Sequence, residues 1–511
     1  MKLFDNESEH RSSLVGYVVG ESRPYMANIV SFRPLLLGEY VYMEYYGYRS
    51  LAFVESTVTG SMILSENILD PRDVERLVKV VRGHERVYYY RGRVRIVGNL
   101  DHNGRVSIPP VPPPPGTEVF RAPPTILRRI FSPAEDGWVK VGTLLREPTV
   151  EVRVNVNKIV SKHLGILAMT GMGKSNLVAL LSKRIGELGG TVIIFDYHGE
   201  YTNMFFRNVH VNVITPQINP YKLEFDELAR LLGLRPNATR QRMVLLECFE
   251  NLKNGDDKKY GMSFFDKLRN CIQGKALRVG EPAQKVLESL ITYSRLLCKI
   301  IDEKVEDVLE RIELGAINVV DLSELRASQA DAVVAHWLQR VLEERKLALW
   351  SRYSSGSLVK LPIPVVVVLE EAHVFIPIDE DTATKKTAEH IAREGRKFGV
   401  GMIVVSQRPR GLDPNILSQM GSLAVLRIAH PEDRYYIAKH CEAVTQELVE
   451  ELSALNVGEA LLLGEWVRIP TVAKVDYVPE KRVGIDLDAV AEWRASKVYK
   501  KLSRMTNNQA L

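Results

Sequence analysis

The sequence predicts an α/β protein with a parallel-sheet core, a small β-barrel at its N-terminus and a helical subdomain inserted into the core. Continuous apolar runs, typical of fully buried parallel strands, recur between helical segments after about residue 150. Short runs rich in β-branched and aromatic residues, punctuated by Gly and Pro, fill residues 12–108. Helical periodicity alone occupies the stretch between Asp226 and Leu314.

Composition places the chain among globular proteins that fold inside a cell. Its 511 residues are 45% hydrophobic and 26% charged, which allows two or three domains around a large core. No apolar run approaches the ~20 residues of a membrane span, and the N-terminus lacks the apolar region of an export signal. We therefore expect a cytoplasmic protein with no membrane association. The net charge of +5 permits a nucleic-acid partner without requiring one. The four cysteines lie far apart without metal-site spacing, which fits a reducing compartment: Cys248, Cys271, Cys298 and Cys441.

The N-terminal region, residues 1–108, is predicted to form a small barrel or sandwich. Runs such as Leu14–Val19 and Tyr40–Tyr46 alternate with turn residues at intervals of roughly ten positions. Residues 109–149 are predicted to connect this domain to the core, because the run Pro109–Pro115 favours a stiff polyproline II segment. A ligand for an SH3-type domain is the alternative for that run.

The α/β core is predicted to comprise two parts of the chain, residues 150–225 and 315–478, separated by the helical insertion at 226–314. A C-terminal extension, 479–511, is predicted to end in a basic helix over Val490–Leu511. The predicted strands of the core are continuous apolar runs: Thr191–Asp196, Pro364–Leu369 and Gly401–Ser406.

A Gly-rich loop connects the apolar run Leu164–Leu167 to an amphipathic helix. In this layout, backbone N–H groups and a helix N-terminus point at phosphate oxygens. Lys174 is predicted to reach the terminal phosphates and take part in catalysis, and Ser175 to hold Mg²⁺, so ATP and Mg²⁺ are the expected cofactors. The predicted nucleotide-binding residues of the loop are Thr170, Gly171, Met172, Gly173, Lys174, Ser175 and Asn176.

One position of the loop departs from the usual pattern. Ala168 stands where the first Gly is expected, and Ala lacks glycine's freedom at positive φ. The turn must therefore begin in a conformation that Ala allows. The alternative to a nucleotide site is a chance Gly-rich turn between a strand and a helix, which the Gly-Lys-Ser sequence after an apolar strand disfavours.

Two carboxylates, Glu370 and Glu371, directly follow the predicted strand that ends at Leu369. The carboxyl ends of parallel strands form the ligand-binding edge of a sheet. Glu370 is predicted to hold Mg²⁺ through its water shell, and Glu371 to orient and deprotonate the attacking water. The alternative is a solvated pair that caps the next helix, and the Val-rich strand before the pair argues against it.

The segment after these carboxylates supplies the remaining catalytic candidates. Arg396 lies in a helical pattern that leads away from the site, so it would reach a neighbouring subunit's nucleotide as an arginine finger, with Arg393 as the second choice. Gln407 ends a predicted strand and is placed to sense the γ-phosphate. A basic, solvated helix end and an ordinary turn residue are the alternatives. Secondary candidates at the end of the Thr191 strand are Asp196 and Glu200.

Five motifs, in this order, together resemble the HerA–FtsK superfamily of hexameric translocases, and within it the archaeal HerA group. They are Thr-Gly-Met-Gly-Lys-Ser-Asn, Phe-Asp-Tyr-His-Gly-Glu-Tyr, Leu-Glu-Glu-Ala-His, Arg-Glu-Gly-Arg-Lys-Phe-Gly and Ser-Gln-Arg-Pro. The resemblance covers nearly the whole chain, more weakly from Asp226 to Leu314 and after Val478. It implies a RecA-like P-loop ATPase core and a barrel of the type found in rotary ATP synthase subunits.

The resemblance also assigns residue roles. It implies that Glu371 is the catalytic carboxylate, Arg396 the finger and Gln407 the sensor. Two further nucleotide-binding residues follow from it. Lys162 stands where relatives often carry Arg near the nucleotide, and Lys474 lies in a predicted C-terminal strand.

The function that the resemblance implies is an ATP-driven homo-hexameric ring on double-stranded DNA. Its implied partners are a nuclease of the NurA type and the archaeal nuclease–ATPase complex of double-strand-break repair, in DNA end resection. One alternative is a ring ATPase that moves protein or single-stranded DNA in conjugation or secretion. Another is a DNA-encircling scaffold that uses ATP only to assemble and recruits a nuclease. Lys385 and Lys386 are candidates for contacts with DNA in the pore, although a solvated loop is the favoured interpretation.

Overall fold

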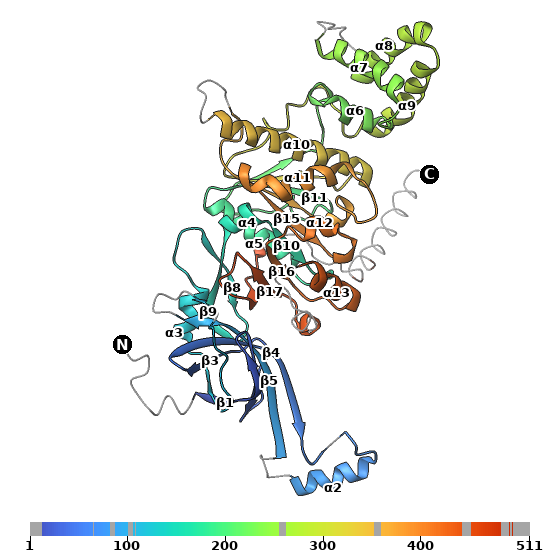
Figure 1. Cartoon of the computed structure of the whole chain (residues 1–511). Coiled ribbons are helices and arrows are strands. Elements are labelled where there is room, and N and C mark those ends of the chain that lie inside the picture. Colours follow the sequence, from blue (N-terminus) through green and yellow to red (C-terminus); the bar gives the residue numbers. More distant parts are fainter. Residues whose placement is uncertain are drawn as a thin grey trace, which may run out of the picture.

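The chain is elongated, with a β-barrel at its N-terminal end, an α/β core in the middle and a helical insertion at the far end (Figure 1). The computed structural model describes residues 13–64, 66–81, 87–100, 106–107, 109–254, 262–351, 359–441, 451–481, 490 and 493. None of the described helices combines the length and apolarity needed to cross a membrane. The three-part architecture confirms the predicted fold class.

The N-terminal sheet closes on itself. Its strands are β1 Leu14–Arg23, β2 Met26–Ser31, β3 Tyr40–Tyr45, β4 Tyr48–Ser61, β5 Tyr88–Leu100, β6 Val106–Ser107 and β7 Glu118–Arg121. They follow the order β2-β1-β7-β3-β4-β5-β6, and an additional pairing of β2 with β5 closes the barrel. Val15, Ile29, Met43 and Val54 belong to a separate buried cluster within it, as alternating strands require.

The barrel region differs from the prediction in two respects. Strand β7 lies in the segment 109–149, which the sequence assigns to a linker, yet it pairs with both β1 and β3. A four-residue strand after a Pro-rich run carries too little alternation to be recognised. A helix, α2 (Pro71–Val81), also lies between β4 and β5, at the end of a two-stranded arm that leaves the barrel (Figure 1).

The core contains an 11-stranded sheet with the order β12-β13-β11-β14-β15-β10-β16-β17-β18-β8-β9. The pairings from β12 to β16 are parallel and those from β16 to β9 antiparallel. The β8–β9 hairpin, which starts inside the predicted linker, therefore belongs to the core. The strands are β8 Trp138–Leu144, β9 Glu147–Asn155, β10 Leu164–Leu167, β11 Thr191–Asp196, β12 Val211–Ile214, β13 Ile317–Asp321, β14 Val365–Leu369, β15 Val400–Ser406, β16 Ser422–Val425, β17 Glu459–Gly464 and β18 Thr471–Val475.

The parallel strands β10, β11, β14 and β15 are buried along their whole length. Because they run the same way, they all end at one side of the sheet, here called the carboxyl edge, and begin at the other, the amino edge. The core helices are α3 Pro124–Phe131, α4 Val156–Lys162, α5 Lys174–Glu187, α10 Ala327–Ser351, α11 Ala383–Phe398, α12 Pro414–Leu417 and α13 Pro431–His440. Short 3₁₀ turns lie at Pro220–Lys222, Ala372–Val374, Pro409–Gly411, Glu451–Ala454 and Pro479–Lys481.

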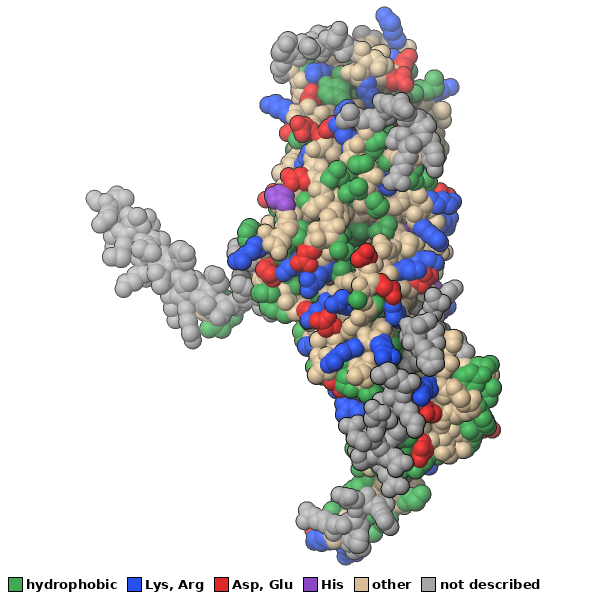
Figure 2. All heavy atoms as spheres, turned by 90° about the vertical axis from the view of Figure 1, so that its left-hand side faces the viewer, with side chains coloured by type: hydrophobic (Ala, Val, Ile, Leu, Met, Phe, Trp, Pro, Cys, Tyr) green, Lys and Arg blue, Asp and Glu red, His purple; other side chains and the backbone are tan. Residues whose placement is uncertain are grey.

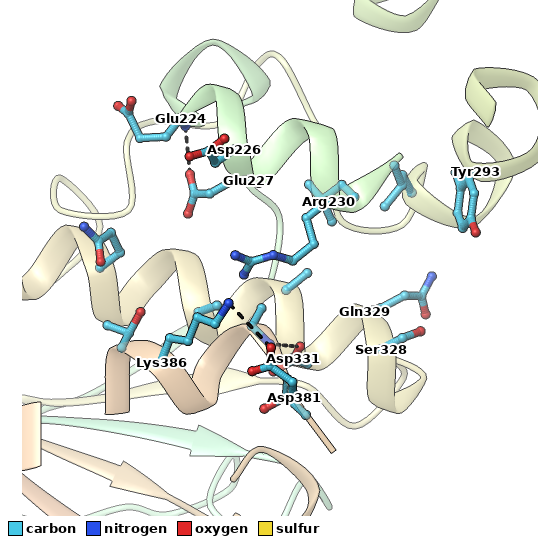
Figure 3. Close-up of a pocket in the computed structure, with 18 of the residues that line it drawn as sticks. Glu224, Asp226, Glu227, Arg230, Tyr293, Ser328, Gln329, Asp331, Asp381 and Lys386 are labelled. Carbon is cyan, nitrogen blue, oxygen red and sulfur yellow. Dashed lines mark hydrogen bonds and ion pairs between the residues drawn. The ribbon is translucent and has the colours of Figure 1, made fainter. Parts of the chain in front are cut away.

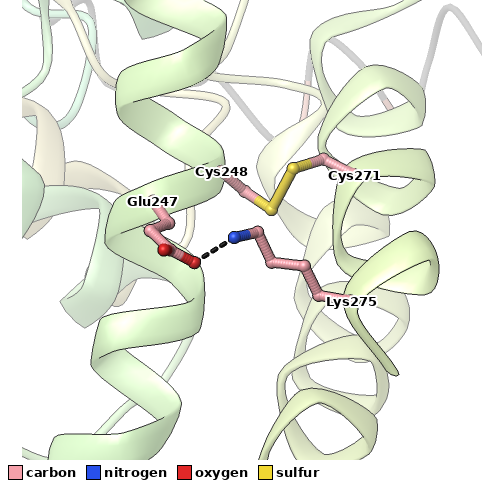
Figure 4. Close-up of a disulfide and its surroundings, with 4 residues drawn as sticks. All are labelled: Glu247, Cys248, Cys271 and Lys275. Carbon is pink, nitrogen blue, oxygen red and sulfur yellow. Dashed lines mark hydrogen bonds and ion pairs between the residues drawn. A yellow bond between two sulfur atoms is a disulfide. The ribbon is translucent and has the colours of Figure 1, made fainter. Parts of the chain in front are cut away.

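The insertion is helical, as predicted, and consists of α6 Phe225–Leu231, α7 Thr239–Asn254, α8 Phe264–Val279 and α9 Glu281–Leu297. Cys248 and Cys271 form a disulfide between α7 and α8, beside an ion pair of Glu247 with Lys275 (Figure 4). Their spacing suggested free thiols, but the two helices pack together and bring them into contact. The cysteines therefore do not support a reducing compartment, although disulfides also occur inside cells of hyperthermophilic archaea and bacteria. The predicted basic helix lies outside the described residues, apart from residues 490 and 493.

Candidate active site

The Gly-rich loop lies at the carboxyl edge, between β10 and α5. Gly171 and Gly173 adopt φ angles of 77° and 105°, in the left-handed region that side chains disfavour. Ala168 does not share this conformation, and its N–H donates to the Ser406 carbonyl at 3.3 Å. The Ala at this position is therefore compatible with the loop, whose last glycine caps the N-terminus of α5.

Lys174 and Ser175 begin α5 at the inside of the loop. The Lys174 Nζ donates to the Met169 carbonyl at 3.4 Å, and only 7% of the residue is exposed. Burial lowers the pKa of Lys174, while the nearby charges of Glu371 and Glu370 oppose that shift. The ammonium group is thus held in a site where bound phosphates would stabilise its charge.

Gln407 reaches the loop from the end of β15. The Thr170 hydroxyl donates to its Oε1, so the predicted sensor and the loop are in direct contact. The Asn176 side chain is engaged elsewhere: its Nδ2 donates to the Asp476 carbonyl and its Oδ1 accepts the Val478 N–H, each at 2.9 Å. Asn176 therefore ties the C-terminal segment to α5, and only its backbone faces the loop.

Lys474 also lies next to the loop. Its Nζ donates to the Val457 carbonyl at 2.7 Å, and the Gly458 N–H donates to the Met172 carbonyl at 3.1 Å. A Cβ on Gly173 would approach the Cα of Gly458 to 3.7 Å. The predicted C-terminal lysine is therefore connected to the phosphate loop of its own chain through one short turn.

Glu370 and Glu371 are both buried at the end of β14, with 2% and 6% of each residue exposed. Burial raises the pKa of Glu370 to about 8, and the neighbouring carboxylates of Glu200 and Glu371 add to the effect. Burial also raises the pKa of Glu371, against the opposing charge of Lys174. Glu371 has left-handed backbone angles, φ 48° and ψ 46°, a strained conformation that is typical of functional sites in a non-glycine residue.

Two histidines flank the Glu371 carboxylate. His198 Nε2 lies 3.7 Å from Oε1, and His373 Nδ1 lies 3.3 Å from Oε2. Ser406 Oγ is 3.3 Å from the same His373 nitrogen. Burial, reinforced by the charge of Arg408, lowers the pKa of His373 to about 4, so this ring is neutral near pH 7. The sequence places His198 only among the supporting groups at the end of the Thr191 strand and assigns no role to His373, because the two histidines come from different strand ends.

Asp196 shapes the loop that carries His198. Its carboxylate is fully buried and accepts the N–H groups of Glu200 and Tyr201 at 2.9 and 2.7 Å. Glu200 pairs with Lys481 at 3.2 Å. Burial alone would raise the pKa of Glu200, but hydrogen bonds from Ser175 and Lys481 hold it below its usual value. Lys481 was missed, because it lies in the C-terminal extension and belongs to no motif.

These groups fit Mg²⁺ bound together with nucleotide phosphates. The Glu370 Oε2 atom is buried without a hydrogen-bond partner, and a cation next to it would remove that penalty. Mg²⁺ in nucleotide sites takes one or two protein ligands and completes its shell with phosphates and water. In keeping with this, the described residues contain no group of three or more His, Cys, Asp or Glu side chains around one metal position. Ser175 and Glu370 remain the predicted ligands.

Arg393 and Arg396 lie near the amino edge of the sheet, at the opposite end of the strands from this pocket. Helix α11 runs back from the carboxyl edge and ends just before β15 begins at the amino edge. The helix axis rises by about 20 Å from Ala383 to Arg396. Both arginines are exposed, so they face outward from the amino edge and away from the phosphate loop of their own chain.

Lys162 shares the amino edge with these arginines. It ends α4, and the four residues of β10 place about 13 Å of strand between it and the loop. Its Nζ pairs with Glu465 at 2.8 Å, and Lys158 pairs with the same carboxylate at 2.9 Å. The structure therefore does not bring Lys162 to the nucleotide pocket of its own chain.

The two lysines proposed for the pore differ in availability. Lys385 Nζ pairs with Asp413 at 2.9 Å and donates to the Pro377 carbonyl at 2.8 Å, and only 14% of its side chain is exposed. It therefore holds the loop before α11 in place and is not free to contact DNA. Lys386 remains exposed.

A separate cavity of about 670 Å³ lies between α6 and α9 of the insertion and α10 and α11 of the core (Figure 3). Several of its polar groups have partners within the same chain. Asp331 accepts the N–H groups of Ala383 and Thr384 at 2.9 and 3.0 Å, and Asp381 pairs with Lys386 at 3.5 Å. Asp331 therefore anchors the first turn of α11, and the cavity is distinct from the nucleotide pocket because its lining includes none of the residues of that pocket.

Comparison with known proteins matches two family descriptions, "Helicase HerA, central domain" over residues 139–341 and "HAS barrel domain" over residues 15–102. The protein described as DNA double-strand break repair helicase HerA of Saccharolobus solfataricus is 37% identical over 503 residues, which cover 96% of this chain and 98% of that protein. Its namesake from Sulfolobus acidocaldarius is 38% identical over 495 residues, 94% and 97% of the two chains. The one from Sulfurisphaera tokodaii is 38% identical over 498 residues, 95% and 97%. With relatives at this identity over nearly its whole length, the chain belongs to the HerA helicase family.

Proposed function

We propose that this chain is the subunit of a homo-hexameric, ATP-driven translocase or helicase on double-stranded DNA. The observation that carries the proposal is the division of the predicted catalytic residues between two edges of one sheet. Lys174, Glu371 and Gln407 gather at the carboxyl edge, whereas Arg396 lies exposed at the amino edge. A ring brings the amino edge of one subunit to the carboxyl edge of the next, so that each pocket is completed by its neighbour.

The residues at the carboxyl edge would perform the hydrolytic step. Bound ATP would supply the phosphoanhydride bond, and Mg²⁺ would offset the negative charge of the phosphates. Lys174 and the loop N–H groups orient the terminal phosphates. Glu371, held between His198 and His373, accepts the proton of the attacking water, and Gln407 reports the occupancy of the loop through Thr170.

Arg396 of the neighbouring subunit would stabilise the charge that develops in the transition state. Because Arg396 and the pocket belong to different subunits, a change in the pocket would shift one subunit relative to the next. Lys162, on the same edge, is proposed to contact the neighbour's nucleotide as well. Lys474 is proposed to bind from within the same chain.

Duplex DNA is proposed as the substrate because the relatives are named as double-strand break repair helicases. On the face shown in Figure 2, the described Lys and Arg side chains are interspersed with Asp and Glu. Such a face favours solubility over binding of phosphates. We propose that the basic residues that contact DNA line the channel of the ring. We further propose a cytoplasmic protein that works with a NurA-type nuclease, and with the nuclease–ATPase complex of break repair, in resecting DNA ends.

The test is ATP hydrolysis measured with and without linear duplex DNA and with and without a NurA-type nuclease, alongside displacement of a roadblock from the duplex. We expect duplex DNA to stimulate hydrolysis, and roadblocks to be displaced only with hydrolysable ATP. Lys174→Ala is the matched control, because it removes the phosphate-binding ammonium and leaves the surface unchanged. A protein that recruits the nuclease but shows no DNA-stimulated turnover is instead the ATP-dependent scaffold.

A further inference from the structure

His163 lies at the point where the elements of the amino edge meet. It follows Lys162 at the end of α4 and precedes β10, and 2% of it is exposed. Its φ of 60° is in the left-handed region, a conformation that a non-glycine residue keeps only where its surroundings enforce it. The contacts of the His163 side chain therefore hold its backbone in this conformation.

The imidazole connects two elements of the core. Its Nδ1 accepts the N–H of Met402, on β15, at 3.1 Å. An acceptor Nδ1 leaves the proton of a neutral ring on Nε2, and this nitrogen is the group available to the backbone of Ala392 and Ile391 on α11, which acts on the pKa of the ring. Burial lowers the pKa of His163 to about 4, so this neutral form persists near pH 7.

The turn of α11 above the ring carries the two exposed arginines. Gly395 lies between Arg393 and Arg396, and a Cβ at this position would come within 3.4 Å of the His163 Cε1 and 2.6 Å of the Val400 carbonyl oxygen. The glycine thus allows the helix to rest directly on the imidazole. At the opposite end of α11, Asp331 caps the first turn, so both ends of the helix are fixed.

Lys162 directly precedes His163 in the chain. Its carbonyl accepts the Gly421 N–H at 2.7 Å, which connects the start of β16 to the end of α4. The side chains of Lys162, Arg393 and Arg396 therefore all belong to backbone next to His163. This histidine is thus a common contact of α4, β15 and α11.

We infer that His163 is a positioning residue for the half of the active site that one subunit offers to the next: its imidazole sets the α11 turn that carries Arg396 in register with Lys162. The inference rests on the proposed function, in which these cations act on the neighbour's nucleotide. His163 itself does not touch that nucleotide.

The test uses His163→Asn in the full chain. Asn keeps an oxygen that can accept the Met402 N–H, but it is too short to donate to the α11 carbonyls. We expect kcat to fall by about 10²-fold, the effect of a small misplacement, with an unchanged KM and unchanged binding of a fluorescent ATP analogue. His163→Gln, whose amide can occupy the place of Nε2–H, should recover much of kcat. An unchanged kcat in His163→Asn, or a loss of nucleotide binding together with kcat, would overturn the inference.

Rings assembled from two variants separate this inference from the proposed function. Co-expression of His163→Asn with Lys174→Ala should restore turnover, because the second subunit offers an intact amino edge to the first subunit's intact pocket. Co-expression of His163→Asn with Arg396→Ala should not, since both lack a working amino edge. If Arg396→Ala with Lys174→Ala recovers turnover while His163→Asn with Lys174→Ala does not, the inference is wrong and the shared pocket stands. If neither pair recovers, the shared pocket fails.

Gly395→Ala guards against a folding defect. Its added Cβ would come within 2.6 Å of the Val400 carbonyl oxygen and 3.4 Å of the His163 Cε1, so it displaces the same turn of α11 and leaves the imidazole itself in place. Should His163→Asn fail to assemble, Gly395→Ala is expected to give the same fall in kcat and the same pattern of recovery. If neither variant assembles, His163 is a determinant of folding and not a positioning residue.

Discussion

The two edges of the central sheet are built in opposite ways. At the carboxyl edge, Lys174, Glu370 and Glu371 are buried together, their pKa values are shifted and the Glu371 backbone is strained. At the amino edge, Arg396 is exposed and Lys162 is engaged in an ordinary surface ion pair. The first edge is recognisable as a site within one chain. The second becomes one only when a neighbouring subunit is placed against it.

The largest effect on ATP turnover is expected at the amino edge. Arg396→Ala should reduce ATP turnover by about 10³–10⁵-fold, the contribution of an arginine finger, while nucleotide binding stays unchanged. Steady-state hydrolysis and equilibrium binding would measure the two. Arg393→Ala is the matched control one turn earlier on the same exposed helix face. A greater loss in the Arg393 variant would transfer the finger role to that residue.

Glu371→Gln tests the carboxyl edge. The amide keeps the shape of the side chain but cannot accept a proton, so turnover should fall by about 10²–10⁴-fold with ATP still bound. Single-turnover hydrolysis measures the chemical step directly. Normal hydrolysis by this variant would remove the general base from the account and leave Glu371 as a structural residue.

The buried neighbour Glu370 makes the folded protein sensitive to pH. Folded Glu370 holds its proton up to about pH 8, whereas the unfolded chain releases it near 4.5, so stability falls as the pH rises between these values. Glu370→Gln removes this penalty. At pH 8, without nucleotide, we expect the variant to be more stable by roughly a few kcal/mol.

Thermal unfolding between pH 4.5 and 8 measures the difference in stability between Glu370→Gln and the wild type. The advantage of Glu370→Gln should shrink towards pH 4.5, where the wild-type carboxyl is protonated and resembles the amide, which makes low pH the internal control. A variant that is less stable than the wild type at pH 8 would contradict the buried, proton-retaining carboxyl.

The smallest effect on turnover is expected far from both edges. Replacing Cys248 and Cys271 by Ser removes the link between α7 and α8, whose closed loop spans a sequence separation of 23. The helical insertion should lose about 3 kcal/mol of stability, while ATP hydrolysis stays close to normal. Hydrogen exchange of the insertion and steady-state hydrolysis report the two. A large fall in turnover would show that the insertion is coupled to the pocket.

How much the sequence could predict depends on how local each signal is. The loop around Lys174 and the pair after Leu369 are short motifs on continuous apolar strands, and their placement at one edge follows from parallel topology. Strand β7 was missed because four residues give no periodicity. The disulfide was missed because it depends on how α7 and α8 pack against each other. Lys481 and His163 act through contacts between remote segments, which no motif records.

The most direct test of the shared pocket is a ring assembled from Lys174→Ala and Arg396→Ala subunits. Each variant alone should be nearly inactive, because every pocket lacks one half. In the mixed ring, the intact carboxyl edge of an Arg396→Ala subunit meets the intact amino edge of a Lys174→Ala subunit, and DNA-stimulated ATP hydrolysis should return. A mixed ring as inactive as its two parents would contradict the account.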